Sequence, residues 1–535
     1  MARLCRTGWA KLIALAAIGF VAVGTLAVAG VGFPLFPEPL PGAKGPGQRW
    51  GSAEGRDHLA VDGTNRTTGQ SLRAKYPLRA PSVRKAAEGR NTATVGTPPT
   101  PAAVTGFDRA TSEEIVSERD AHSRTYANAD GTETTELSTT PLHFRDRAGA
   151  WQTVDPALVA SDGGWTGAAG SVDVRLAGRA DAERLAAVTL PSGESFAYGL
   201  EGAAAAKGSA GDAAEGGAAD SRVSYREVLP ETDLWLDSRA GGVKETLVLR
   251  STDAPTSFDF PLTLTGLTAK PGTAQLGGEG SVILVDDRGR TKAVIPAGFM
   301  EDANGAVSHA VRYELITRDG GQALRVGADR DWLADPARAF PVRLDPSVDT
   351  TTASRSMYVT ENGPVAGSNE LHVGKGTAGS TASYLGFPGL DTELRNHKIF
   401  GAQLQVVNYD APSCKPRSVS VHPVTQSWTT ATGGSYPGPS VGGSLASKSF
   451  AYGHIAVGSS KSGCPAAGEL FDLGKGGRDL VQRWVDGSQP NYGLSLRASA
   501  SDPLGFKKFT GDTTANPPKL FVTHSPYNAS YSFPK

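Results

Sequence analysis

A long series of short apolar segments, separated by turn-forming residues, is the feature that most constrains what this chain can fold into. Between residues 111 and 523 most segments are short, and many alternate apolar with polar side chains. In residues 369–387, for example, Leu371 and Val373 alternate with polar residues, and a second β-prone run follows at 383–387. The 66 glycines and 35 prolines add turns and leave little room for long helices. The sequence therefore predicts an all-β fold with antiparallel strands.

The predicted strands fall into two groups, the first of which resembles a sandwich and the second a jelly roll with one short helix. That helix is predicted at 478–485, because Leu480, Val481 and Trp484 share one face. A further helix is predicted to start at Thr111–Glu114, with Thr111 or Ser112 as its cap. The strands are predicted at 142–144, 187–190, 246–249, 282–285 and 311–316 in the first group, and at 355–360, 370–374, 383–387, 397–408, 418–424, 491–497 and 519–523 in the second.

These patterns divide the chain into five predicted parts. A β-rich, sandwich-like domain and a jelly-roll domain are separated by a proline stop near residue 347. The parts are a signal segment at 1–29, a proline-rich linker at 30–110, the β-rich domain at 111–347, the jelly roll at 348–527 and a tail at 528–535.

The first residues predict export. A basic start precedes an apolar run from 12 to 31, and Ala27–Ala29 offers a small-x-small site for cleavage after Ala29. The alternative is an uncleaved anchor, because about 20 apolar residues can span a bilayer. In both cases the chain from Lys44 onward lies outside the cytoplasm, and the membrane is a partner only through an uncleaved signal.

Three cysteines agree with an exported protein. Cys5 lies in the signal segment, which leaves Cys414 and Cys464. An oxidising compartment favours a disulfide between them, and two free thiols are the alternative.

The second β region resembles the DNRLRE-type carbohydrate-binding modules, which are jelly-roll domains of secreted bacterial proteins. The resemblance implies a β-sandwich that binds polysaccharide. His372 and Gly386 depart from it, because relatives often carry a basic residue at these two strand positions. The matching segments, in the family's order, are Leu371–Gly374, Ser383–Leu385 with Phe387, Ile399–Leu404, Val419–His422 with Trp428, Val481 with Trp484, Asn491–Leu494 and Pro517–Leu520.

The whole layout also resembles the N-terminal part of secreted Rhs or wall-associated proteins of actinobacteria. In those proteins an Arg-Trp-Gly-Ser segment, seen here at Arg49–Ser52, and a β-rich domain precede the module. Tyrosine/aspartate repeats and a toxin follow, and here they would begin near Lys535. The resemblance implies presentation or delivery with a Rhs-type partner protein.

Charge and motif spacing give no sign of catalysis. The 53 basic and 54 acidic residues balance, so nucleic acid is not an expected partner. Gly438–Gly442 has the spacing of a nucleophile elbow but lacks a following helix. No two of the nine histidines lie at zinc-ligand spacing, so a catalytic metal is not expected. No cofactor is predicted apart from a structural calcium ion. Its candidate ligands are Glu370, Asp391 and Glu393, for which plain surface charge is the alternative interpretation.

Candidate ligand-binding residues are aromatic and basic side chains of the second region. A sugar ring is recognised by a flat aromatic side chain with polar groups around it. Trp428 and Trp484 are predicted to be core residues instead, because they lie in apolar patterns. The candidates are Tyr384, Tyr436, Tyr452, His372 and Lys375.

The sequence taken alone thus favours a secreted, non-enzymatic protein whose jelly roll binds polysaccharide or cell-wall glycan, with the first β domain as a scaffold. One alternative is a presentation, adhesion or delivery module of a Rhs-type secreted system. Another is a hydrolase or lyase acting on wall glycans, because the spacing of catalytic carboxylates cannot be read from sequence.

Overall fold

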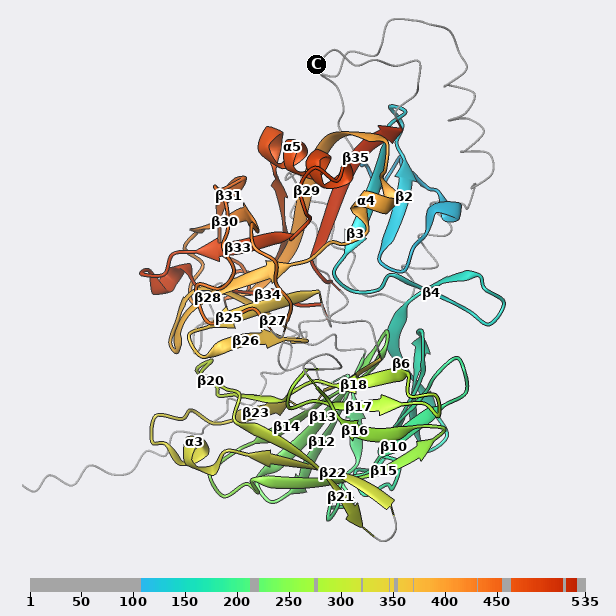
Figure 1. Ribbon diagram of the computed structural model, residues 1–535. Helices are drawn as coiled ribbons and strands as arrows, with labels where there is room; N and C mark the ends of the chain where they lie inside the picture. Colours follow the sequence, from blue (N-terminus) through green and yellow to red (C-terminus); the bar gives the residue numbers. More distant parts are fainter. Residues whose placement is uncertain are drawn as a thin grey trace, which may run out of the picture. The chain divides into compact units, whose positions relative to one another are not determined.

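A computed structural model describes residues 107–211, 221–273, 278–318, 321–345, 347–350, 355–368, 370–430, 432–454, 463–512 and 516–526. The predicted signal segment, most of the linker and the tail lie outside the described residues. The fold is all-β and its strand pairs are antiparallel, as the alternating pattern predicted (Figure 1). No helix within the described ranges is long and apolar enough to cross a membrane.

The first sandwich consists of two sheets. Its core lies between them, where Val174 and Phe196 of one sheet join the same apolar cluster as Leu234 and Leu247 of the other. One sheet has the order β21-β22-β15-β10-β9-β8-β7-β6. Its strands are β6 (Asp155–Ser161), β7 (Gly164–Ala169), β8 (Asp173–Ala177), β9 (Ala186–Thr189), β10 (Ser195–Tyr198), β15 (Ser257–Thr265), β21 (Val311–Arg318) and β22 (Gly321–Ala328).

The opposing sheet has the order β11-β12-β13-β14-β24-β18-β17-β16, and β19, β20 and β23 join it beside β14. Its strands are β11 (Gly208–Ala210), β12 (Arg222–Leu229), β13 (Thr232–Arg239), β14 (Gly242–Leu249), β16 (Thr268–Pro271), β17 (Val282–Val285), β18 (Thr291–Ile295), β19 (Phe299–Glu301), β20 (Val307–Ser308), β23 (Val342–Asp345) and β24 (Ser347–Thr350). Outside both sheets lie the hairpin of β4 (His143–Arg145) with β5 (Trp151–Thr153), and the helix α3 (Arg330–Ala334).

The second sandwich is one continuous sheet folded over at the β27–β28 hairpin. Leu371 and Leu404 on one half pack in the same core as Leu385 and Leu496 on the other. One half contains β1 (Glu113–Glu114), β2 (Ser123–Ala127), β3 (Glu133–Ser138), β27 (Glu370–Gly376), β29 (His397–Asp410), β32 (Ala467–Asp472), β34 (Lys507–Thr510) and β35 (Lys519–Pro526). The other contains β25 (Ser356–Thr360), β26 (Gly363–Ala366), β28 (Gly379–Leu385), β30 (Arg417–Pro423), β31 (Ala446–Phe450) and β33 (Leu494–Ala498).

Helix α5 (Gly474–Val485) packs on β29 and buries Leu480, Val481 and Trp484, as its apolar face predicted. A short helix α4 (Leu390–Glu393) lies beside it, and 3₁₀ turns occur at η2 (Val116–Glu118) and η3 (Pro503–Gly505).

The predicted helix start at Thr111–Glu114 is wrong. Glu113 and Glu114 form β1, which pairs with β2, and only the short turn η2 follows. The Ser112 hydroxyl does not cap a helix: it donates a hydrogen bond to the buried Asn128 side chain at 2.9 Å.

The sheets divide the chain at other places than the predicted boundaries. Strand β3 pairs with β35 along its whole length, from Glu133 opposite His524 to Ser138 opposite Lys519. Residues 113–138 are therefore part of the second sandwich, and in Figure 1 the blue and cyan β2 and β3 lie beside the red β35. Conversely, β24 at 347–350 lies in the first sandwich.

The predicted disulfide is present between Cys414 and Cys464, with a Cα–Cα distance of 5.7 Å. It joins the segment after β29 to the segment before β32. Such a bridge agrees with the predicted export to an oxidising, extracellular compartment.

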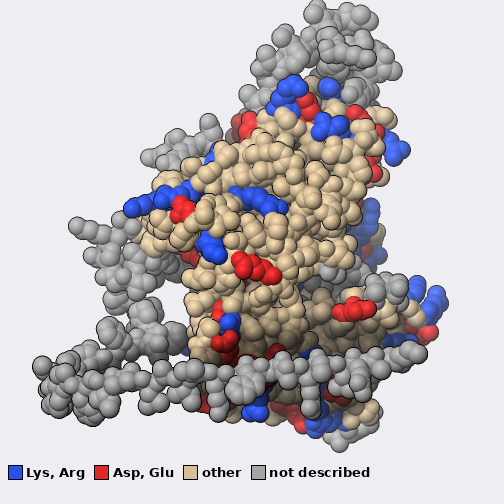
Figure 2. Space-filling model, turned by 60° about the vertical axis from the view of Figure 1, so that its left-hand side comes forward, with Lys and Arg blue, Asp and Glu red and all other residues tan. Residues whose placement is uncertain are grey.

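On the face shown in Figure 2, charged side chains form small groups among a majority of uncharged residues.

Candidate functional site

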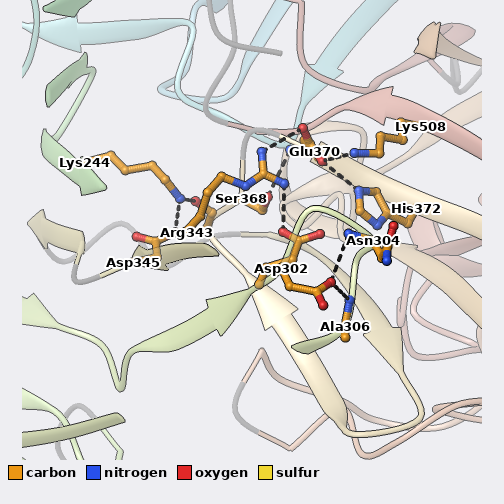
Figure 3. Close-up of polar contacts among 12 residues, drawn as sticks. Lys244, Asp302, Asn304, Ala306, Arg343, Asp345, Ser368, Glu370, His372 and Lys508 are labelled. Atoms are coloured by element: carbon orange, nitrogen blue, oxygen red, sulfur yellow. Dashed lines mark hydrogen bonds and ion pairs between the residues drawn. The ribbon is translucent and has the colours of Figure 1, made fainter. Parts of the chain in front are cut away.

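A buried polar junction joins the two sandwiches. From the first sandwich it receives Glu301 of β19 and Arg343 of β23, which are neighbours in register. From the second it receives Glu370 and His372 of β27, together with Lys508 of β34, which pairs with His372 (Figure 3). Antiparallel pairing places such side chains opposite one another on the same sheet face.

Arg343 is the link across the junction. Its Nη2 donates to Glu301 Oε2 at 3.1 Å, and its Nη1 approaches Glu370 Oε1 at 3.4 Å. The two carboxylate side chains are only 4% and 5% exposed. A buried carboxylate needs a partner of opposite charge, so one guanidinium ties both sandwiches together.

Glu370 has two further partners in its own sandwich. Lys508 Nζ donates to Glu370 Oε2 at 3.1 Å, and His372 Nε2 lies 2.8 Å from the same oxygen. Burial alone would raise the pKa of Glu370, but Lys508 and Arg343 hold it well below its usual range. The group is therefore a carboxylate at neutral pH and is unsuited to donating a proton.

A second ion pair lies next to the first. Lys244 of β14 contacts the Asp345 carboxylate and donates to the backbone carbonyl of Gly367 at 3.1 Å. Arg239 donates to the same carbonyl at 2.9 Å. Burial lowers the pKa of Lys244, and Asp345 partly offsets this. The segment before β27 is thus held by two cations of the first sandwich.

Backbone contacts and apolar packing complete the junction. Asn362 of the β25–β26 turn donates to the Val307 carbonyl at 2.8 Å, and Thr377 of the β27–β28 turn contacts the Asn304 carbonyl. Phe299 and Val307 of the first sandwich pack in one buried cluster with Tyr358 and Val365 of the second.

A small cavity lies within this junction. Its volume is about 30 Å³, enough for a water molecule and too small for a sugar ring or a nucleotide. Figure 3 shows several of its lining side chains in contact with one another. The lining residues are Arg222, Trp235, Lys244, Thr246, Phe299, Glu301, Arg343, Asp345, Ser368 and Glu370.

Glu301, Glu370 and His372 have the ligand types of a metal site, and their ligand atoms lie within 4.8 Å of one another. However, Arg343 already binds both carboxylates and Lys508 binds Glu370. A divalent ion would have to sit beside two fixed cations. The arrangement therefore fits a structural ion-pair network better than a metal site.

The sequence-predicted binding residues are not brought together on one open surface. Tyr384 and His372 are 0% and 2% exposed, so neither offers a ring face to a sugar. Tyr436 is half-buried against the cluster that contains Tyr384, and Tyr452 stacks on Phe450 with ring centroids 5.5 Å apart. Lys375 is half-buried at the β27–β28 hairpin.

The carboxylates suggested for calcium are also placed differently. Among the described residues, Glu370 groups with Glu301 and His372, whereas Asp391 and Glu393 lie on α4. Asp391 and Glu393 were grouped with Glu370 because they are near it in the sequence. The residues that surround Glu370 in the structure include Arg343 of β23 and Lys508 of β34.

No family model matches the chain. Curated proteins similar to it include the tRNA nuclease WapA of Bacillus subtilis strain 168, with 29% identity over 268 residues. They also include the tRNA(Glu)-specific nuclease WapA of Bacillus subtilis subsp. natto, with 28% identity over 265 residues, and the tRNA3(Ser)-specific nuclease WapA of Bacillus spizizenii, with 28% over 268 residues. Each match covers 46% of this chain and 11% of the relative, so the chain spans about a tenth of these relatives.

These relatives correct several predictions. They are named as nucleases, which contradicts the predicted non-enzymatic, carbohydrate-binding function. Their named substrates are tRNAs, which contradicts the predicted polysaccharide partner and the exclusion of nucleic acid. The prediction failed because the balanced charge of this chain does not report what much longer relatives act on outside the aligned residues. Over the aligned residues, this chain is similar to proteins named as WapA tRNA nucleases.

Proposed function

We propose that this chain is a presentation and delivery module of a secreted nuclease of the WapA type, acting outside the cell that makes it. The observation that carries the proposal is the 28–29% identity to three WapA nucleases over about half of this chain. The predicted alternative of a Rhs-type delivery module agrees with this similarity. By analogy with these relatives, we propose tRNA as the substrate of the nuclease that the module serves.

The two sandwiches suit a supporting role. A buried junction makes them one unit, through Arg343 between Glu301 and Glu370 and through the Lys244–Asp345 pair. A disulfide also closes the chain between β29 and β32. Both features favour a support that stays folded outside the cell. We further propose association with the cell wall, and a DNRLRE-like ancestry for the fold of the second sandwich.

A competition assay tests the delivery function. The gene is deleted in the producing strain and restored with the wild-type chain, and each strain is grown with a competitor that lacks the whole gene region. The expected result is tRNA fragments in the competitor, seen on denaturing gels, only when the wild-type chain is present. Equal competitor survival and intact tRNA with and without the chain would overturn the proposal.

Matched variants connect the assay to the structure. Arg343→Met breaks the buried junction, whereas Arg330→Met changes an exposed arginine of α3. We expect Arg343→Met to reduce tRNA cleavage in the competitor and Arg330→Met to leave it at the wild-type level. Secreted amounts of each variant, measured by immunoblot, separate loss of delivery from loss of protein.

A further inference from the structure

Two histidines and a carboxylate meet on three neighbouring strands of the second sandwich, outside the junction described above. His524 of β35 lies between Glu133 of β3 and His397 of β29 in the hydrogen-bonded order β3-β35-β29. Glu133 is the register partner of His524. Three adjacent strands thus contribute one potential metal ligand each.

The ligand atoms are close enough to share one ion. His397 Nδ1 and His524 Nδ1 are 2.8 Å apart, and Glu133 Oε2 is 3.7 Å from His524 Nδ1. All three ligand atoms lie within 4.8 Å of one another. Tetrahedral zinc with Zn–N bonds of about 2.0–2.1 Å separates two ligand nitrogens by roughly 3.3 Å. The two rings would have to open by only about 0.5 Å to admit the ion.

The surroundings favour ligation through Nδ1 of His524. Its other ring nitrogen, Nε2, lies 2.8 Å from the hydroxyl of Thr135, which in turn lies 2.9 Å from the hydroxyl of Thr125. A proton on Nε2 that is donated to Thr135 leaves the lone pair of Nδ1 directed at His397. Metal-binding histidines are commonly oriented by such a hydrogen bond from the second ring nitrogen.

The backbone around His397 is also fixed. The Gln482 side chain of α5 donates to the His397 carbonyl at 3.1 Å and accepts from the Ile399 N–H at 2.9 Å. This pair of hydrogen bonds holds the start of β29 against the helix. The His524 side chain is 1% exposed and the Glu133 side chain 13%, while His397 is half-buried, so only the His397 side of the site is near water.

We propose that Glu133, His397 and His524 form a binding site for a first-row divalent metal ion, with zinc as the best fit. Two imidazoles and one carboxylate are ligands that zinc accepts, and a water molecule would complete the tetrahedron. The ion would take the place of the hydrogen bond between the two Nδ1 atoms. It would tie β3 to β35 and β29, and so fix the N-terminal strands to the second sandwich. Zinc binding here is independent of the delivery function proposed above.

The test uses the purified full chain, dialysed first against EDTA and then against metal-free buffer. Zinc is titrated into it, and isothermal titration calorimetry measures the binding. One zinc ion per chain is expected, and at about 100 times the Kd the unfolding equilibrium constant should fall about 100-fold. With Co²⁺ as a probe, an intense visible spectrum of tetrahedral type is expected. Failure to bind zinc, or a weak Co²⁺ spectrum of octahedral type, would overturn the site and leave the His–His contact as a hydrogen bond.

Three variants assign the ion to these residues. His397→Gln and Glu133→Gln should each weaken zinc binding at least tenfold and abolish the tetrahedral Co²⁺ spectrum. His422→Gln is the matched control, because His422 lies on β30 and contacts Ser420 and the Gly442 carbonyl. Far-UV circular dichroism verifies that each variant is folded. Equal zinc affinity in all three variants would place the ion elsewhere and refute the proposal.

Discussion

Glu393, at the end of α4, is a carboxyl group whose ionisation opposes folding. Burial raises its pKa to about 7, and the nearby carboxylates of Asp120 and Asp391 add to the effect, while Ser123 and Arg355 act against it. Because the folded-state pKa lies above the usual value of about 4.3, the folded state binds the proton more tightly. The protonated Glu393 carboxyl therefore favours the folded state at low pH, and this contribution to the free energy of unfolding is lost as the pH rises toward and through 7.

We therefore expect Glu393→Gln to raise the free energy of unfolding by about 2 kcal/mol at pH 8, with a much smaller change at pH 5. The amide keeps the size of the side chain and removes the charge. Urea denaturation at the two pH values measures this. Glu183→Gln, at an exposed carboxylate, is the control and should change little at either pH. Equal effects of Glu393→Gln at both pH values would contradict the pKa assignment.

Single residues also show what a sequence can and cannot predict. Leu371 and Val373 were predicted to face a core, and they are 1% and 0% exposed. The alternate residues Glu370 and His372 are equally buried, because the first sandwich covers the other face of β27. Similarly, His397 and His524 are 127 residues apart, so no spacing rule along the chain brings them together.

The segment between β29 and β32, which contains β30 and β31, is closed by a covalent link. The bridge between Cys414 and Cys464 closes a loop with a sequence separation of 50 residues. We expect Cys414→Ser or Cys464→Ser to lower the free energy of unfolding by about 4 kcal/mol, the value for chain entropy in a loop of this length. Chemical denaturation of each variant measures the loss, and the reduced wild-type chain should match both. Variants as stable as the oxidised wild type would rule this contribution out.

Among the elements, those with a strong local pattern were predicted best. Strand β17 has the predicted bounds, Val282–Val285, because four consecutive β-prone residues lie between turns. Helix α5 starts at Gly474, four residues before the predicted start, although three of its first four residues are glycines. Packing against β29 overrides their low helix propensity. The failed helix at Thr111–Glu114 has the same cause, since pairing with β2 outweighs a favourable cap sequence.

At the scale of the whole molecule, Arg343 is the ion-pair link that helps the two sandwiches to behave as one unit. Arg343→Met leaves the buried carboxylates of Glu301 and Glu370 without their shared cation, which should cost about 3–5 kcal/mol. We expect calorimetry to show the sandwiches unfolding at separate temperatures in this variant and together in the wild type. Arg330→Met should unfold like the wild type. A single, unshifted transition in Arg343→Met would show that the junction is held by its other contacts.

The pairing of β3 with β35 determines when the second sandwich can form. Thr134 contacts Thr523, which lies 389 residues later in the sequence. Among the described strands, β35 is the one that joins β1–β3 to the rest of their sheet. Strand β3 cannot pair with β35 until residue 526 has been synthesised, so the second sandwich is completed only after that point. If the chain crosses the membrane unfolded, β3 and β35 can pair only after both have crossed it, and the second sandwich then becomes complete outside the cell.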